Sequence, residues 1–175
     1  MKGIAAAREV LRLDPNLAAG YYYLGMNIGQ LARTKKLGAL KLVDEMESSF
    51  CSVTKLNPGF DFAGAHRSLG LLYRDAPGWP ISVGSRSKAR QHLSKAVEMS
   101  PEYPDNWLSL IEGYLNWNEK EKAQTQFNAA TEHLLAARKR FTGEEWQATW
   151  EDWDKRIDGI RSELRAEKFR SPKSQ

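Results

Sequence analysis

The chain has 175 residues, of which 41% are hydrophobic and 27% charged, and its net charge is +4. This length suffices for one domain with a sizeable core, while the mild charge and the shortness of the one dense basic cluster, "ARKR" at residues 137–140, argue against nucleic-acid binding. The single cysteine, Cys51, excludes an internal disulfide and a thiolate metal cluster, and no apolar run approaches the ~20 residues that a membrane span needs.

The first expected element is a helix over residues 2–13, within "MKGIAAAREVLRLDP". No secretory apolar region follows Met1, so this beginning is either the natural start or the edge of a fragment whose leader is missing. Too few residues precede the helix to form a partner for it. It is therefore expected to be the lone second helix of a pair.

Three prolines then recur at intervals of 43 residues. Pro15, Pro58 and Pro101 close the segments "VLRLDP", "VTKLNP" and "AVEMSP". Each proline follows an apolar helical pattern, which a proline would stop. Two equal intervals with matching flanks indicate an internal repeat.

The repeat predicts three antiparallel helix pairs, at about residues 18–57, 63–100 and 104–137. In the first pair, a turn near Lys36–Gly38 would join two lengthened helices. Within each pair, small side chains would let the two helices approach while larger ones fill the space between them. The expected packing residues are Tyr21, Leu24, Gly25, Ile28, Phe50 and Val53 in the first pair, Leu69, Gly70, Tyr73, Ala89, Leu93 and Ala96 in the second, and Trp107, Leu110, Tyr114, Ala123, Phe127 and Ala130 in the third.

The third pair, "WLSLIEGYLNWNEKEKAQTQFNAA", resembles the tetratricopeptide repeat, whose signature is W-x2-L-G-x2-Y followed by A-x3-F and a proline. The resemblance covers about residues 3–135. Ile111 stands where the glycine is usual and His66 where the tryptophan is usual. The resemblance implies an all-α fold, a right-handed superhelix of antiparallel helix pairs. Each unit here is longer than the usual repeat of about 34 residues.

Residues 74–88, "RDAPGWPISVGSRSK", interrupt the second pair with two prolines and two glycines. This composition excludes a helix interior and predicts an extended loop between the paired helices. One interpretation is that Trp79 and Ile81 fold back over the edge of the repeat as a local plug. The other is that the loop walls one end of a ligand or partner site.

A last helix is expected over residues 142–168, followed by a frayed tail at 169–175. "TGEE" is typical of a capping box, with Thr142 as the N-cap and Glu145 reaching back. The helix would belong to the same domain and cap the last repeat, or it would form a homo-oligomer through its tryptophans. Its apolar stripe is Trp146, Trp150, Trp153, Ile157, Ile160 and Leu164.

The sequence holds no pattern typical of an enzyme, a cofactor site or a metal site. His66, His92 and His133 are scattered without the spacing of zinc ligands, and His92 is interpreted as a surface or packing residue. "VGSRSK" at residues 83–88 lacks the spaced glycines of a phosphate loop, and no serine lies in a nucleophile elbow. We therefore expect no catalysis.

A groove on the concave side of the repeat is the expected binding surface. Its apolar and basic side chains would suit a protein or peptide partner, or a small amphiphilic anion. Arg67 and Arg74 would alternatively be solvated or paired with nearby acids. The candidate partner or ligand residues are Tyr22, Met26, Arg67, Leu71, Arg74, Trp79, Leu108 and Glu112, with Leu115 beside them.

Residues 56–116, with "LNP-x-F" and "APGWP-x-S-x-G", also resemble the T-component type of repeat protein of TRAP transporters. That resemblance implies a bacterial, periplasmic or envelope-associated protein that binds a solute-binding partner and a small apolar or anionic ligand; without it, the protein would be cytoplasmic. The leading hypothesis is a noncatalytic scaffold for a protein or peptide, and the transport accessory is the alternative. A closed cavity lined by Tyr73, Met26 and Trp79 would favour the alternative, and an open trough the scaffold.

Overall fold

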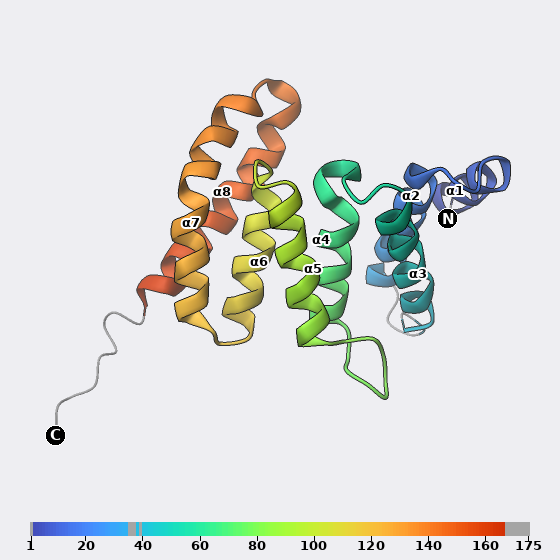
Figure 1. The fold of residues 1–175 in the computed structure, drawn as a ribbon, viewed down its shortest axis with the longest axis horizontal. Helices are drawn as coiled ribbons and strands as arrows, with labels where there is room; N and C mark the ends of the chain where they lie inside the picture. Colours follow the sequence, from blue (N-terminus) through green and yellow to red (C-terminus); the bar gives the residue numbers. More distant parts are fainter. Residues whose placement is uncertain (1, 35–37, 39, 167–175) are drawn as a thin grey trace. The chain divides into compact units, whose positions relative to one another are not determined.

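The computed structural model describes residues 2–34, 38 and 40–166, and these residues form α-helices joined by loops (Figure 1). The all-α prediction is confirmed, since the described part of the chain contains no strand beyond an isolated bridge between Gly78 and Gly84. The chain divides into two compact units, Met1–Met99 and Ser100–Gln175. The helices are α1 (Lys2–Leu13), α2 (Ala18–Thr34), α3 (Leu40–Leu56), α4 (Phe60–Asp75) and α5 (Arg86–Met99) in the first unit, and α6 (Pro104–Asn116), α7 (Lys120–Arg140) and α8 (Glu144–Arg165) in the second.

Consecutive helices of the first unit pack against one another, from α1 on α2 to α4 on α5. Glycines set how closely they approach. A Cβ atom on Gly25 would lie 2.8 Å from the ring of Phe50, and one on Gly70 would lie 2.5 Å from Cγ of Leu93. Phe50 and Leu93 are buried. The predicted pairing of a small residue with a large one therefore forms the core of both hairpins.

The second unit contains the repeat that matches the signature best. Trp107, Leu110 and Tyr114 on α6 are buried, as are Ala123 and Ala130 on α7. The Trp107 indole stacks on the ring of His133 from α7 at 5.2 Å, and its Nε1–H donates to the carbonyl of Pro101 at 2.7 Å. The predicted close packing of this pair is confirmed.

Helix α8 packs against α6 and α7 within the second unit. Trp153 is 2% exposed. Its ring meets those of Trp150 and Tyr103 edge to face, with ring centroids 4.8 Å and 5.4 Å apart. The Nε1–H of Trp150 donates to the carbonyl of Phe141 at 2.7 Å. Trp150 and Trp153 are therefore buried inside their own unit and are not exposed to a second copy, whereas Trp146 is half-buried.

The predicted capping box is wrong. Helix α8 begins at Glu144, with Gly143 as the N-cap, and no side chain caps its end. Gly143 has φ +101°, a conformation that a residue with a Cβ rarely adopts. The N-cap is therefore Gly143, one residue after the predicted Thr142, and the Thr142 side chain does not cap the helix.

The extended loop between α4 and α5 is confirmed, and it projects beyond the ends of both helices (Figure 1). Its backbone hydrogen bonds close the loop on its own base: the N–H of Gly84 donates to the carbonyl of Pro77 at 2.9 Å, and that of Ser85 to Tyr73 at 2.8 Å. Trp79 is 89% exposed and Ile81 66% exposed. The predicted local plug is therefore wrong, because the loop bonds to itself and holds its tip away from the helices.

Candidate functional site

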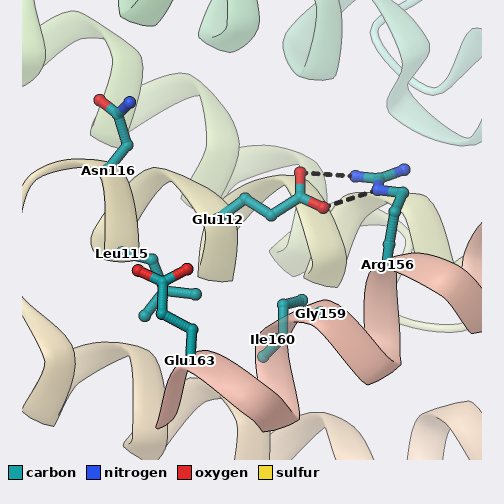
Figure 2. Close-up of a pocket in the computed structure, with 7 residues that line it drawn as sticks. All are labelled: Glu112, Leu115, Asn116, Arg156, Gly159, Ile160 and Glu163. Atoms are coloured by element: carbon teal, nitrogen blue, oxygen red, sulfur yellow. Dashed lines mark hydrogen bonds and ion pairs between the residues drawn. The ribbon is translucent and has the colours of Figure 1, made fainter. Parts of the chain in front are cut away.

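The second unit contains a groove between α6 and α8, with a volume of about 460 Å³ (Figure 2). We call it the α6/α8 groove. It is open to solvent on one side. Its lining residues are Glu112, Leu115 and Asn116 from α6, and Arg156, Gly159, Ile160 and Glu163 from α8.

Gly159 keeps this groove open. The groove-lining positions of α8 recur at intervals of three and four residues, so they share one helix face. A Cβ atom added to Gly159 would meet no atom within 4 Å. Glycine inside a helix is less favourable than alanine by about 1 kcal/mol. Here its missing side chain leaves space between the two helices.

Arg156 fixes one wall of the groove. Its Nε–H donates to Oε1 of Glu112 at 2.7 Å and its Nη2–H to Oε2 at 2.9 Å, the two dashed contacts of Figure 2. Its Nη1–H donates to Oδ1 of Asp105 at 2.5 Å. Burial alone would lower the pKa of Arg156, but the hydrogen bonds and charges of Glu112 and Asp105 outweigh burial and raise that pKa. The guanidinium therefore stays charged and holds the Glu112 carboxylate in place.

The groove combines an apolar floor with an acidic rim. Leu115 and Ile160 are almost fully buried beneath it. The carboxylates of Asp105, Glu112 and Asp152 all lie within 4 Å of Arg156, so acids outnumber the one guanidinium there. The Glu163 carboxylate adds a further negative charge to the rim. This arrangement suits an apolar side chain that has a cation next to it.

Two of the residues expected in the concave groove line the α6/α8 groove, namely Glu112 and Leu115. Leu108, one turn before Glu112 on α6, is fully buried. It packs in the core and does not line the groove. The sequence did not indicate the α8 half of the groove, because that helix lay outside the recognised repeat.

Tyr22 and Arg67, also expected in the groove, are buried and bind Asp61. The hydroxyl of Tyr22 donates to Oδ2 of Asp61 at 2.5 Å, and Nη2–H of Arg67 donates to the same oxygen at 3.3 Å. Asp61, Phe62 and Ala63 have φ values between 51° and 58°, a left-handed turn at the start of α4. Tyr22 and Arg67 therefore stabilise this turn. Of the two interpretations of Arg67, a groove residue or a residue paired with a nearby acid, the structure shows the second.

The other expected residues of the first unit lie at the surface. Met26 is 47% exposed. Leu71 and Arg74 are half-buried, and Nε–H of Arg74 donates to Oδ1 of Asp75 at 2.6 Å. Trp79 projects into solvent whereas Tyr73 is buried. Trp79 and Tyr73 therefore do not line one closed cavity.

The sequence did not indicate a histidine pair in the hairpin of α4 and α5. Nδ1 of His66 lies 3.0 Å from Nδ1 of His92. The pKa of His92 is lowered to about 4 by burial and by the charges of His66 and Lys88, and burial also lowers the pKa of His66. Their separation of 26 positions in the sequence hid the pair from a search for helical spacing. In the described part of the chain, no group of three or more metal-ligating side chains could hold a metal ion.

Tyr73 lies beside this pair, with its ring centroid 5.5 Å from that of His92. Its hydroxyl donates to Oε1 of Glu47 on α3 at 2.5 Å. Burial and this carboxylate raise the pKa of Tyr73, so the hydroxyl stays protonated. Nζ of Lys88 lies 3.7 Å from the same carboxylate oxygen. This cluster joins α3, α4 and α5.

No protein-family model matches the sequence, and no curated protein matches it. A solved structure that resembles the chain is that of a thermophilic tetratricopeptide repeat (TPR) protein from Thermus thermophilus. The two share 22% sequence identity with a TM-score of 0.62, over 78% of this chain and 68% of that one. At this identity the likeness shows the fold, a helical repeat of the tetratricopeptide type. In the described residues, no helix is long and apolar enough to cross a membrane.

Proposed function

We propose that this protein is a noncatalytic scaffold that binds a short segment of a partner protein in the α6/α8 groove. The observation that carries the proposal is an open groove with an apolar floor and an acidic rim, formed by α6 of the last repeat and the following helix α8. Stacked helix pairs commonly present such surfaces to partners. The volume of about 460 Å³ lies in the range of sites that hold small ligands.

The side chains suit a peptide with an apolar residue next to a basic one. Leu115 and Ile160 would contact the apolar side chain, and Glu163 would pair with the basic one. The amide of Asn116 can both donate to and accept from a peptide backbone. Such a site would bind through a few anchor residues, as protein interfaces generally do.

The alternative, a transport accessory with a ligand beneath the loop of residues 76–85, requires an enclosed site there. Trp79 at 89% exposure lines no such enclosure. The open α6/α8 groove therefore favours the scaffold over the transport accessory.

The test is selection from a displayed library of random peptides of about twelve residues, followed by affinity measurements on the tightest ones. Gly159→Leu would place a side chain in the empty space of the groove. We expect wild type to select peptides with an apolar residue adjacent to Lys or Arg, and Gly159→Leu to bind them at least about tenfold more weakly.

Ser162→Leu is the matched control, because Ser162 is an exposed residue of α8 that does not line the groove. It adds the same side chain to the same helix and should bind like wild type. Thermal melts show whether both variants are folded. A folded Gly159→Leu variant that binds the selected peptides as tightly as wild type would contradict the proposal.

A further inference from the structure

The tip of the loop between α4 and α5 presents two large apolar side chains, Trp79 and Ile81, to solvent. The loop backbone is fixed by its own hydrogen bonds, including that from the N–H of Ile81 to the carbonyl of Gly78 at 3.0 Å. A Cβ atom on Gly84 would lie 2.6 Å from the carbonyl oxygen of Pro77, so the closure leaves no room for a side chain there. A fixed backbone reduces the entropy lost on binding, and tryptophan is a frequent anchor of interfaces.

Basic residues lie at the base of this loop, in the two helices that it joins. Arg74 lies in the last turn of the preceding helix, and Arg86 and Lys88 begin the following one. Arg74 is paired with Asp75, the one acidic residue between 74 and 88. Nζ of Lys88 lies 3.7 Å from a carboxylate oxygen of Glu47 on α3. The three basic residues at the base of the loop therefore stand beside two carboxylates, which leaves a small excess of positive charge there.

The two units also differ in charge. Residues 1–99 contain 14 Lys and Arg against 8 Asp and Glu, a net charge of +6, and residues 100–175 contain 12 against 14, a net charge of −2. The tip belongs to the basic unit and the α6/α8 groove to the acidic one. One copy of the chain therefore carries both an apolar–basic projection and an apolar–acidic groove.

We infer that the loop tip of one copy binds in the α6/α8 groove of a second copy. This inference rests on the proposed function, since it names the partner segment of the same groove. The indole of Trp79 packs on Leu115 and Ile160, and its Nε1–H donates to the Glu163 carboxylate. The small excess of positive charge at the base of the loop is attracted to the acidic rim.

The contact joins two different surfaces, so each copy offers a free tip or a free groove after one contact has formed. Such heterologous contacts build rings or open chains of copies. Two anchor side chains and a few exposed ion pairs make a small interface, which is typical of weak association. The association is therefore expected at about 10 µM to 1 mM and is weakened by salt.

The experiment is analytical ultracentrifugation of the full chain across that concentration range. The weight-average mass of wild type should rise above the 19.9 kDa of one chain and fall back in about 0.5 M sodium chloride. Trp79→Ala and Gly159→Leu should each stay monomeric, whereas Ser162→Leu should behave like wild type. Trp79 is exposed, so removing its indole should not unfold the chain.

A mixture of the two variants gives the sharpest result. Trp79→Ala keeps an intact groove, and Gly159→Leu keeps an intact tip. An equimolar mixture can form one contact and no more, so it should form a 1:1 dimer although neither variant associates alone. A mixture that stays monomeric, a wild type that stays monomeric at every concentration, or a Trp79→Ala variant that associates like wild type would overturn the inference.

The failure of this inference is distinguishable from that of the proposed function. Selected peptides that bind the groove of a monomeric wild type would overturn only the self-docking. Binding of monomeric wild type to vesicles of anionic phospholipid through Trp79 would also overturn it, because the tip would then have a different occupant.

Discussion

Tyr22 and Arg67 show how the environment of one residue decides its role. Both converge on Asp61, which stands at the start of three consecutive left-handed residues. Each such residue other than glycine costs about 1–3 kcal/mol and persists only where its surroundings hold it. The buried Tyr22 hydroxyl and the buried Arg67 guanidinium both bind the Asp61 carboxylate, and these hydrogen bonds stabilise the left-handed turn. The sequence pattern placed both residues on a helix face but could not indicate the bend that turns them inward.

Gly159 gives a prediction about stability. Because a Cβ atom there meets nothing within 4 Å and alanine is the better helix former, Gly159→Ala should stabilise the chain by about 1 kcal/mol. Thermal denaturation measures this change. A lower melting temperature for Gly159→Ala would show that the helix needs glycine at this position and that the groove is not open there.

The site could be predicted from the sequence only in part: Glu112 was expected, and Glu163 was not. Glu112 and Leu115 followed from the repeat signature, because they stand five positions after Trp107 and Leu110 on the same helix and so share one helix face. Glu163 and Gly159 did not follow, since they lie on a helix that was recognised only by its tryptophan stripe. A site shared by two helices becomes visible only when their packing is known.

At the scale of elements, the hairpin of α4 and α5 is expected to be sensitive to acid. His92 has a folded pKa of about 4, below the ordinary value of 6.5. Between these values the unfolded state binds more protons, so stability rises with pH. The contribution of the neutral pair is complete above about pH 6.5 and is lost as the pH falls toward 4. The charged and titratable groups around the pair are Glu47, Cys51, Tyr73, Lys88 and Lys95.

Urea unfolding at about pH 7 and about pH 4.5, compared between wild type and His92→Gln, measures this effect. Wild type should lose more stability than the variant on acidification, by about 1 kcal/mol, since exposure to solvent reduces the shift. Equal losses for the two chains would show that the histidine pair does not contribute.

The elements themselves were largely predictable. Pro58 and Pro101 indicated where helices end, and the composition of residues 76–85 indicated the loop between α4 and α5. The direction of the loop tip was not predictable, because the exposure of Trp79 follows from backbone hydrogen bonds such as that from Gly84 to Pro77, which no residue pattern indicates. The start of α8 was misplaced by one residue for a similar reason, since Gly143 adopts a left-handed conformation that no periodicity indicates.

At the scale of the molecule, the chain is a helical repeat with two compact units of opposite net charge. The acidic unit contains the α6/α8 groove, and the basic unit contains the projecting loop. The fold accounts for both. Helix α8 packs on the last hairpin and leaves a groove beside α6, and a hairpin end tolerates a long loop because loop closure costs little extra entropy as the loop lengthens.

The central claim is that the α6/α8 groove binds an apolar and basic segment. The most direct measurement is a nuclear magnetic resonance titration of the ¹⁵N-labelled chain with the tightest peptide of the library. The backbone amides of Asn116, Gly159 and Glu163 should show the largest chemical-shift changes. Changes confined to the first unit, with these three amides unmoved, would contradict the claim.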